Sequence, residues 1–151
     1  MSPGFLPPKP LPAHIPKDRL AFDIDGVVAD IMTTFLALAR ETPLLFVTAR
    51  DRRRPIEHWL HRHLAPVPPE SIRVLATGDP DTKIHCLKDH GIQYFVEDRL
   101  ETCLQLASHG ITPILFAQPW NRQPHPFPEV ADWPELARLL FGGDENVEGG
   151  G

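Results

Sequence analysis

Short apolar runs alternate with amphipathic segments along most of the chain. Each run is bounded by glycine, proline or polar residues, which is typical of buried strands. Five strands are expected, at Leu20–Ile24, Leu44–Val47, Ile72–Ala76, Tyr94–Val96 and Ile114–Ala117. Because segments with helical periodicity separate them, the pattern predicts βαβ crossovers and a parallel α/β sheet covered on both faces.

The segments between the strands repeat apolar residues at the three- and four-residue spacing of amphipathic helices. One helix is expected after Asp30 as its N-cap, and four others at Ile56–Leu64, Thr82–His90, Leu100–His109 and Pro134–Phe141. The residues expected to face inward on the second and fourth helices are Ile56, Trp59, Leu60 and Leu64, and Leu100, Cys103, Leu104 and Ala107. Glycines at 91 and 110 are expected to end two of the helices, as glycine commonly does one residue past the C-cap.

The two ends of the chain differ in composition from the middle. Residues 1–17 contain six prolines and are interpreted as an extended N-terminal arm. Residues 142–151 consist mainly of glycine and acids, with little to bury, and are expected to be disordered. Residues 18–141 then form one folded domain, which fits a chain of 151 residues.

Composition and charge argue against several classes of protein. A net charge of −5 argues against a protein that coats nucleic acid, and no apolar stretch approaches the roughly 18 residues of a membrane span. Two cysteines, Cys86 and Cys103, are too few for a disulfide framework and are expected to be reduced. Because the N-terminus also lacks the pattern of a signal peptide, a cytoplasmic protein without a membrane partner is expected.

The segment Phe22-Asp23-Ile24-Asp25-Gly26 carries the clearest chemical signal. A buried strand ends here in two carboxylates, at the sheet edge where open parallel sheets place their ligands. Side chains at i and i+2 share a face of a strand, so Asp23 and Asp25 can both reach one group. Buried charges without a partner are costly, and Mg²⁺ favours one or two carboxylates together with phosphate oxygens. The segment therefore indicates a magnesium site, with a fragment of a calcium-binding loop and a solvated turn as the two alternatives for Asp-x-Asp-Gly taken alone.

Further polar residues follow the second and fourth strands. These are Thr48-Ala49-Arg50 and Glu97-Asp98, and Lys83 opens the helix before the fourth strand. Taken singly, each residue has an ordinary explanation. Asp98 could be a strand-end acid paired with Arg99. Thr48 could be a packing residue, and Lys83 a solvated helix residue. Because the carboxyl ends of parallel strands share one edge, the whole set is expected to meet there, which favours a functional site.

In this order the set resembles the haloacid dehalogenase superfamily of aspartyl-phosphate phosphohydrolases. The likeness runs from about Leu20 to Arg122, and two stretches, Tyr94–Glu101 and Gln118–Arg122, resemble its branch of 5′(3′)-deoxyribonucleotidases. The residues that correspond to the superfamily's four motifs are Phe22-Asp23-Ile24-Asp25-Gly26-Val27, Thr48, Lys83 and Glu97-Asp98.

The resemblance implies a fold and a reaction. The fold would be a three-layer sandwich around a Rossmann-like sheet of five parallel strands in the order 5-4-1-2-3. The reaction would be Mg²⁺-dependent hydrolysis of a phosphomonoester through an aspartyl-phosphate intermediate, similar to that of a nucleotidase. The substrate would be a phosphorylated small molecule or the phosphorylated end of a macromolecule.

The resemblance also implies a role for each residue of the set. Asp23 would attack phosphorus, and Asp25 would act as general acid and then as general base. Lys83 would neutralise the charge that develops on phosphate and nucleophile. The groups that bind the phosphoryl oxygens would come from Thr48, Ala49, Arg50 and Lys83, and the magnesium ligands from Asp23, the backbone carbonyl of Asp25, and Asp98, with Glu97 holding a metal-bound water.

The sequence departs from these nucleotidases between the first and second motifs, where they insert a helical cap. Residues 30–43 leave room for one short helix, so a capless protein is expected. The site would then stay open, or be covered by the N-terminal arm or by a lid from another subunit of a homo-oligomer.

A basic run of Arg52, Arg53 and Arg54 follows the second motif. One interpretation is a solvated helix start with one arginine paired to Asp51; the other is an anion-binding rim for a phosphorylated macromolecule. The histidines on the next helix do not suggest a zinc site, because they do not all share one helix face; they are His58, His61 and His63.

Two other functions remain open at this point. A phospho-acceptor receiver domain uses a similar set of residues, but its acceptor aspartate ends the third strand, which here ends in Ala76-Thr77-Gly78 without an acid. A catalytically weak or inactive relative could bind a phosphorylated partner. The pair Asp23 and Asp25 argues against that alternative, because a binding protein needs no general acid.

Overall fold

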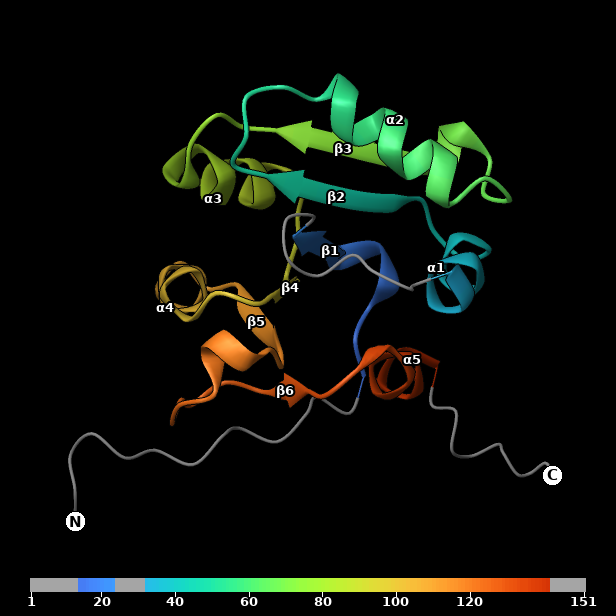
Figure 1. Ribbon diagram of the computed structural model, residues 1–151. Helices are drawn as coiled ribbons and strands as arrows, with labels where there is room; N and C mark the ends of the chain where they lie inside the picture. The colour runs from blue at the N-terminus through green and yellow to red at the C-terminus, as the bar shows by residue number, and fades with distance from the viewer. Residues whose placement is uncertain (1–13, 24–31, 142–151) are drawn as a thin grey trace, which may run out of the picture.

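The computed structural model describes residues 14–23 and 32–141. A six-stranded parallel sheet forms its centre, in the order β3-β2-β1-β4-β5-β6 (Figure 1). The strands are β1 (Leu20–Asp23), β2 (Leu44–Thr48), β3 (Ile72–Ala76), β4 (Tyr94–Glu97), β5 (Thr112–Phe116) and β6 (Glu129–Val130). The α-helices are α1 (Met32–Ala39), α2 (Arg54–His63), α3 (Pro80–Asp89), α4 (Leu100–Ser108) and α5 (Trp133–Phe141), and three short 3₁₀ helices are η1 (Lys17–Arg19), η2 (Pro69–Ser71) and η3 (Pro119–Asn121).

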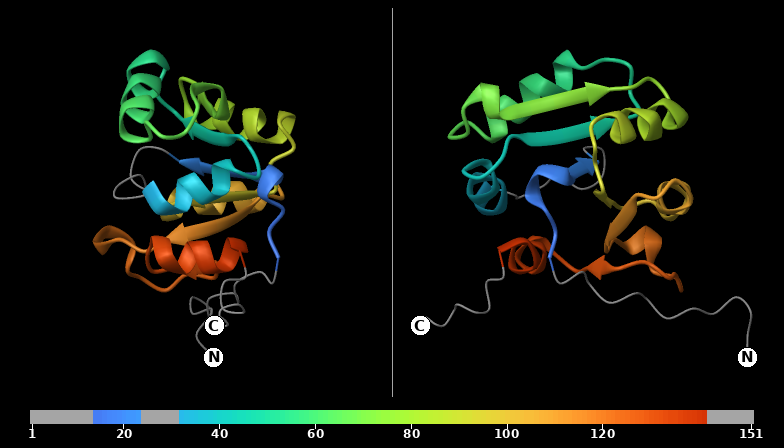
Figure 2. Two further views of the ribbon diagram at one scale, coloured as in Figure 1. Left: turned by 90° about the vertical axis from the view of Figure 1, so that its right-hand side faces the viewer. Right: turned by 180° about the vertical axis from the view of Figure 1, so that it is seen from behind.

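Helices cover both faces of the sheet, as the alternation of strands and helices predicted. The helices α1, α2 and α5 lie on one face, and α3 and α4 lie on the other (Figures 1 and 2). Successive residues of β1 divide between the two: Leu20 and Phe22 belong to the cluster under α1, α2 and α5, and Ala21 to the cluster under α3 and α4. Within the described ranges, none of the helices has the length and apolar character needed to cross a lipid bilayer.

The order of the first five strands agrees with the expected 5-4-1-2-3, but the predicted number of strands is wrong. A sixth strand, β6, pairs in parallel with β5, so that Leu115 lies opposite Glu129 and Phe116 opposite Val130. Two residues are too few to show the period of a strand, and the segment before them is rich in proline. This strand therefore depends on the edge that β5 offers rather than on a local pattern.

The ends of the elements follow local capping chemistry. Helix α3 begins at Pro80, before the expected Thr82, because the Asp79 side chain caps it by accepting the Thr82 N–H at 2.8 Å. This bond to the backbone lowers the pKa of Asp79. Gly91 and Gly110 follow α3 and α4 with φ of +70° and +82°, as expected of residues past a helix end. The expected N-cap at Asp30 lies outside the described residues.

Two of the predicted inward faces are partly wrong. On α4 the buried stripe is Cys103 and Leu106, whereas Leu104 is 59% exposed and Ala107 is also exposed. The helix packs on the sheet through a narrow stripe, and residues one position away from that stripe are turned by about 100° toward solvent. On α2, Trp59 is 40% exposed and stacks on the ring of His63 at 4.0 Å.

Aromatic rings join the centre of the sheet to its helices. Phe35 of α1 is fully buried and lies 4.8 Å from Phe22 and 5.1 Å from Phe46, between ring centroids. The same ring meets Trp133 of α5 at 5.2 Å. These edge-to-face contacts fix the two helices on the sheet beside β1. The thiols of Cys86 and Cys103 are both free, as expected.

We expect Leu106→Ala to lower the free energy of unfolding by about 2–5 kcal/mol, because it leaves a cavity in the core under α4. The matched control is Leu104→Ala on the exposed side of the same helix, which should change it by no more than about 0.5 kcal/mol. Urea denaturation of both variants measures the difference. Equal losses would show that α4 does not present this face to the sheet.

Candidate active site

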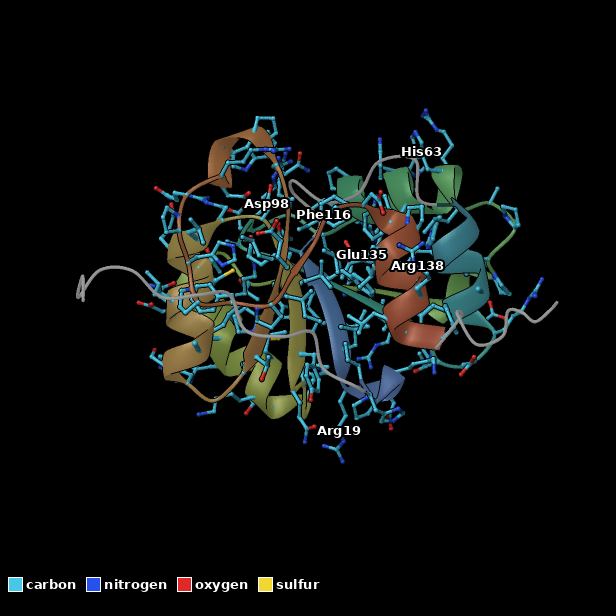
Figure 3. The ribbon with its side chains drawn as sticks, turned by 90° about the horizontal axis from the view of Figure 1, so that it is seen from below. Arg19, His63, Asp98, Phe116, Glu135 and Arg138 are labelled. Carbon is cyan, nitrogen blue, oxygen red and sulfur yellow. The ribbon has the colours of Figure 1, made fainter. Side chains whose placement is uncertain are left out.

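The site lies where the strand order reverses. The chain moves outward from β1 through β2 to β3, and then returns to the other side of β1 with β4. Open α/β sheets bind their ligands in the crevice at this switch point, outside the carboxyl ends of the strands. Figure 3 shows Asp98, which follows β4, at one end of the strands, and Arg19, which precedes β1, at the other. Asp98 therefore lies at the carboxyl edge, as does Asp23, the last residue of β1.

Asp23 and Glu97 point to the same face of the sheet, where Lys83 reaches them. Ala21 and Phe95, two residues earlier on β1 and β4, belong to the cluster under α3 and α4, so alternation places both carboxylates on that side. The Lys83 ammonium donates to Asp23 Oδ1 at 2.8 Å and to Glu97 Oε1 at 3.3 Å. It also lies 4.8 Å from the centroid of the Phe95 ring. The three ionisable groups thus form one buried network.

The charges of this network are nearly fully removed from water. The exposed fractions are 2% for Asp23, 5% for Lys83, 1% for Glu97 and 3% for Asp98. Burial, followed by the nearby Asp23 carboxylate, raises the pKa of Glu97 to about 8, although Lys83 opposes this. Burial disfavours the charged ammonium of Lys83, but the carboxylates of Glu97 and Asp23 outweigh it and raise its pKa. The lysine therefore carries its charge at neutral pH.

Three of the acids could share a cation. One oxygen each from Asp23, Glu97 and Asp98 lie within 4.8 Å of one another. Three buried carboxyl groups converge beside one lysine ammonium, and a set of oxygen donors of this kind fits a divalent cation such as Mg²⁺. In residues 14–23 and 32–141 this is the one such group of histidines, cysteines or acids, and the histidines of α2 are not part of it.

Glu97 also organises the turn that carries Asp98. Its second oxygen, Oε2, accepts the N–H of Asp98 at 3.2 Å and of Arg99 at 3.3 Å. The sequence left open that Asp98 pairs with Arg99. In the structure the Arg99 guanidinium pairs with Glu101 instead, at 3.1 Å. Glu97 therefore joins the lysine to the backbone of the next acid, a connection that the sequence did not suggest.

Three of the residues predicted to bind phosphate lie at the end of β2 and in the turn after it. Asp23 lies opposite Val47 in the β1–β2 ladder, which places the buried Thr48 one residue further along the neighbouring strand. The Thr48 hydroxyl accepts the Arg50 N–H at 3.1 Å. Ala49, between them, is half-buried, whereas Arg50 is exposed. The three residues therefore begin a turn at the same edge as the acids.

This turn is fastened to the end of β3. The Thr77 hydroxyl donates to the Thr48 carbonyl at 2.9 Å, and the Gly78 N–H donates to the Arg50 carbonyl at 3.1 Å. Gly78 has φ of +86°, a conformation that glycine adopts without strain. Thr77 and Gly78 were read from the sequence only as the end of a strand without an acid, so their contact with the turn was missed.

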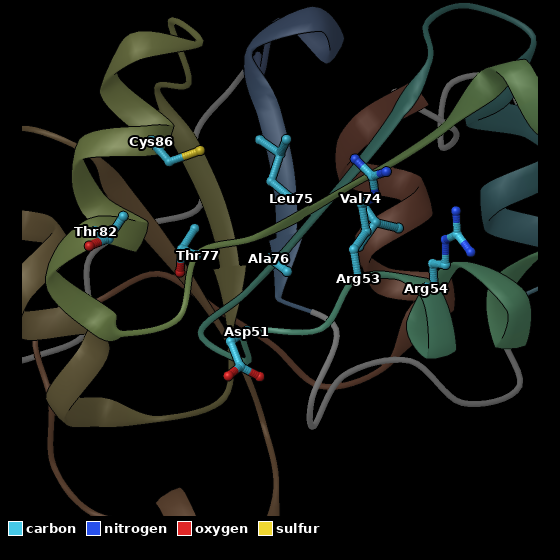
Figure 4. Close-up of a pocket in the computed structure, with 9 residues that line it drawn as sticks. All are labelled: Asp51, Arg53, Arg54, Val74, Leu75, Ala76, Thr77, Thr82 and Cys86. Carbon is cyan, nitrogen blue, oxygen red and sulfur yellow. The ribbon is translucent and has the colours of Figure 1, made fainter.

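The arginine run borders a pocket beside β3. Arg53 Nε lies 3.5 Å from Glu57 Oε2, so the arginine pair found here is with Glu57 rather than the expected one with Asp51. A pocket of about 430 Å³ opens next to these residues (Figure 4). Its lining comes from the start of α2, the end of β3 and the start of α3, and includes Asp51, Arg53, Arg54, Thr77 and Thr82. Two arginines, one acid and two hydroxyl groups thus border this pocket at the β3 edge of the sheet.

Asp25 lies outside the described residues, as does most of the N-terminal arm. Of the other predicted site residues, the structure brings together Asp23, Lys83, Glu97 and Asp98 in one hydrogen-bonded and charge-coupled group. Thr48 lies one strand away, at the same edge. This edge of the sheet therefore combines the ion pair of Asp23 and Lys83 with a group of three acids that fits a divalent metal ion.

Comparison with known proteins gives a weak likeness to a nucleotidase. No protein-family model matches the chain. The chain is similar to a nucleotidase of Clostridium acetobutylicum, with 25% identity over 95 residues, which make up 63% of this chain and 48% of that protein. The chain thus spans about half the length of this relative. Together with the parallel α/β sheet, this likeness fits a phosphatase-like fold.

We expect Lys83→Met to lower the free energy of unfolding by about 3–5 kcal/mol in a buffer with EDTA, because it leaves the buried carboxyl groups of Asp23 and Glu97 without the ammonium that they share. The control is Lys88→Met on the same helix, where the lysine is exposed and the change should stay within about 1 kcal/mol. Urea denaturation at neutral pH measures both. Similar effects of the two changes would contradict the buried network.

Proposed function

We propose that the protein is a Mg²⁺-dependent phosphomonoester hydrolase of the haloacid dehalogenase type that works through an aspartyl-phosphate intermediate. The observation that carries the proposal is the buried group of Asp23, Lys83, Glu97 and Asp98 at the switch point of the sheet. Burying several charges is costly, so a merely structural origin would leave this concentration unexplained. The likeness to a nucleotidase supports the same class of reaction.

Asp23 is the proposed nucleophile. The bond from Lys83 at 2.8 Å favours its ionised form and holds one carboxylate oxygen in place. A carboxylate oxygen attacks phosphorus while the bond from phosphorus to the leaving alcohol breaks, and Asp25 gives its proton to the alcohol oxygen. Asp25 then takes a proton from water, whose oxygen attacks phosphorus and releases Asp23 and inorganic phosphate. The lysine disperses the negative charge that accumulates during both steps.

A bound Mg²⁺ would reduce the repulsion between the anionic nucleophile and the phosphate. The residues proposed to hold it are Asp23, Asp98 and the backbone carbonyl of Asp25. Glu97 was first expected to hold a metal-bound water. Its bonds to Lys83 and to the Asp98 N–H add the role of placing those two groups.

The turn of Thr48, Ala49 and Arg50 is the proposed binding site for the phosphoryl oxygens, together with Lys83. Its support is positional: the turn follows β2, next to β1, and bonds from Thr77 and Gly78 hold it against β3. A turn held on both sides loses little further freedom when a phosphate binds, which favours affinity.

The substrate site is proposed to lack a cap. Residues 24–43 separate β1 from β2, and their described part holds only the eight-residue helix α1. An open site would accept a phosphorylated macromolecular end as well as a small nucleotide, unless the N-terminal arm or a second subunit covers it. The arginines beside the pocket at β3 would then help to attract a large polyanionic substrate.

The decisive experiment is a Mg²⁺-dependent phosphatase screen with nucleoside monophosphates, sugar phosphates, phosphopeptides and 5′-phosphorylated oligonucleotides. We expect Asp23→Asn to reduce the rate on the best substrate by about 10³-fold or more, because the amide is a poor nucleophile. The matched control is Asp18→Asn, an exposed acid before β1, which should leave the rate unchanged. More than a few per cent of the wild-type rate in Asp23→Asn would rule out covalent catalysis by Asp23.

The open-site proposal predicts a selective effect of the arginines. Arg54→Ala should lower kcat/KM for a 5′-phosphorylated oligonucleotide by about two- to fivefold, because an exposed charge contributes modestly to binding. The value for thymidine monophosphate should not change. Arg62→Ala, near the other end of the same helix, serves as the control. A high kcat/KM for one mononucleotide, unaffected by Arg54→Ala in a monomeric protein, would contradict the open site.

A further inference from the structure

A buried asparagine connects the ends of β4 and β5 beside the acid group. Asn121, on η3, is 3% exposed. Its Nδ2 donates to the Asp98 carbonyl at 2.8 Å and to the Phe116 carbonyl at 2.9 Å. Figure 3 shows Asp98 and Phe116 at the same end of the sheet. One side chain thus joins the residue after β4 to the last residue of β5.

Asn121 bonds to a part of the chain, the backbone of Asp98, that lies past the end of the ladder between β4 and β5. The ladder between β4 and β5 ends with Glu97 opposite Leu115. Asp98 therefore follows the last paired residue of its strand. Asn121 supplies a hydrogen bond to its carbonyl just past the point where the backbone pairing stops.

Both main-chain polar groups of Asp98 are consequently fixed by side chains. Glu97 Oε2 accepts its N–H at 3.2 Å, and Asn121 Nδ2 donates to its carbonyl at 2.8 Å. With its N–H and its carbonyl both held, the backbone dihedral angles of Asp98 have little freedom to change. Its carboxylate is then directed into the group with Asp23 and Glu97, within 4.8 Å of each.

A primary amide is well suited to this position. The two carbonyls need two N–H donors from one planar group, and the amide oxygen is used as well, since it accepts the Gln118 N–H at 3.0 Å. An aspartate of the same shape would present only acceptors to the two carbonyls and would add a negative charge beside the acid group. An alanine would leave both carbonyls without this donor.

We propose that Asn121 is a positioning residue for the metal site, which acts by fixing the backbone of Asp98 rather than by touching metal or substrate. This inference rests on the proposed role of Asp98 as a metal ligand. Side chains that orient metal ligands commonly affect metal affinity by about 10–100-fold when they are changed. Asn121 should therefore act on metal affinity more than on the chemical step.

The test uses the full chain and Mn²⁺ as a probe, with free Mn²⁺ measured by electron paramagnetic resonance. Asn121→Ala, which removes both donors without adding charge, should raise the dissociation constant by about 10–100-fold, and Asn121→Asp, whose added negative charge attracts the cation, should raise it less. The control is Gln123→Glu, an exposed residue of the same loop with the same change of charge, which should stay within about twofold. Circular dichroism establishes that each variant is folded at the temperature of the measurement.

A second readout separates positioning from general damage. In a phosphatase assay, the Mg²⁺ concentration for half-maximal rate should rise in Asn121→Asp or Asn121→Ala, and saturating Mg²⁺ should restore much of the rate. A variant that is less stable to heat but binds Mn²⁺ as tightly as the wild type would overturn the inference. If Asn121→Asp does not fold, Asn121→Ala decides in the same way.

The outcomes also separate this inference from the proposed function. A wild-type protein that binds Mn²⁺ but hydrolyses no phosphomonoester would contradict the proposed function, while the comparison of dissociation constants would still test Asn121. A wild-type protein that binds no Mn²⁺ would overturn the inference itself.

Discussion

The contact on which the site depends is the bond of one lysine to two buried carboxylates. Without the Lys83 ammonium, Asp23 and Glu97 would face each other from neighbouring strands with little water to screen them. The lysine comes from α3, so the position of that helix on the sheet sets the electrostatics of the edge. Packing of Ile84 and Leu87 from the same helix into the core holds the lysine there. The hydrophobic packing under α3 thus determines where the Lys83 ammonium lies relative to the acids at the sheet edge.

Glu97 and Asn121 give the acid group its geometry from two directions. One bonds the N–H of Asp98 and the other its carbonyl, and Glu97 also bonds the lysine. Three elements, α3, β4 and η3, are therefore joined through side chains where the backbone ladder ends. A metal that binds the acids would meet groups already held in place, so its binding free energy would not be spent on ordering them.

The sequence predicted those features that depend on local pattern. Apolar runs located five strands, their acidic ends located Asp23 and Asp98, and Lys83 could be placed because it opens a helix before β4. Features that depend on tertiary neighbours were missed. β6 exists because β5 has a free edge, and Leu104 faces solvent because α4 packs through a narrower stripe than its apolar residues suggest. The contacts of Asn121 join residues 23 and 5 positions away in the chain, and no residue pattern shows them.

The packing of α5, the last helix, against elements from earlier in the chain has a consequence for how the protein folds. Trp133 of α5 packs on Phe35 of α1 at 5.2 Å and on Phe116 of β5 at 4.7 Å. The first of these contacts joins residues 98 positions apart (133 − 35). Contacts of such long range require a large part of the chain to be ordered before they form, which slows folding. The aromatic core beside β1 should therefore be completed late, and the side of Phe35 that Trp133 covers would stay exposed until α5 has formed.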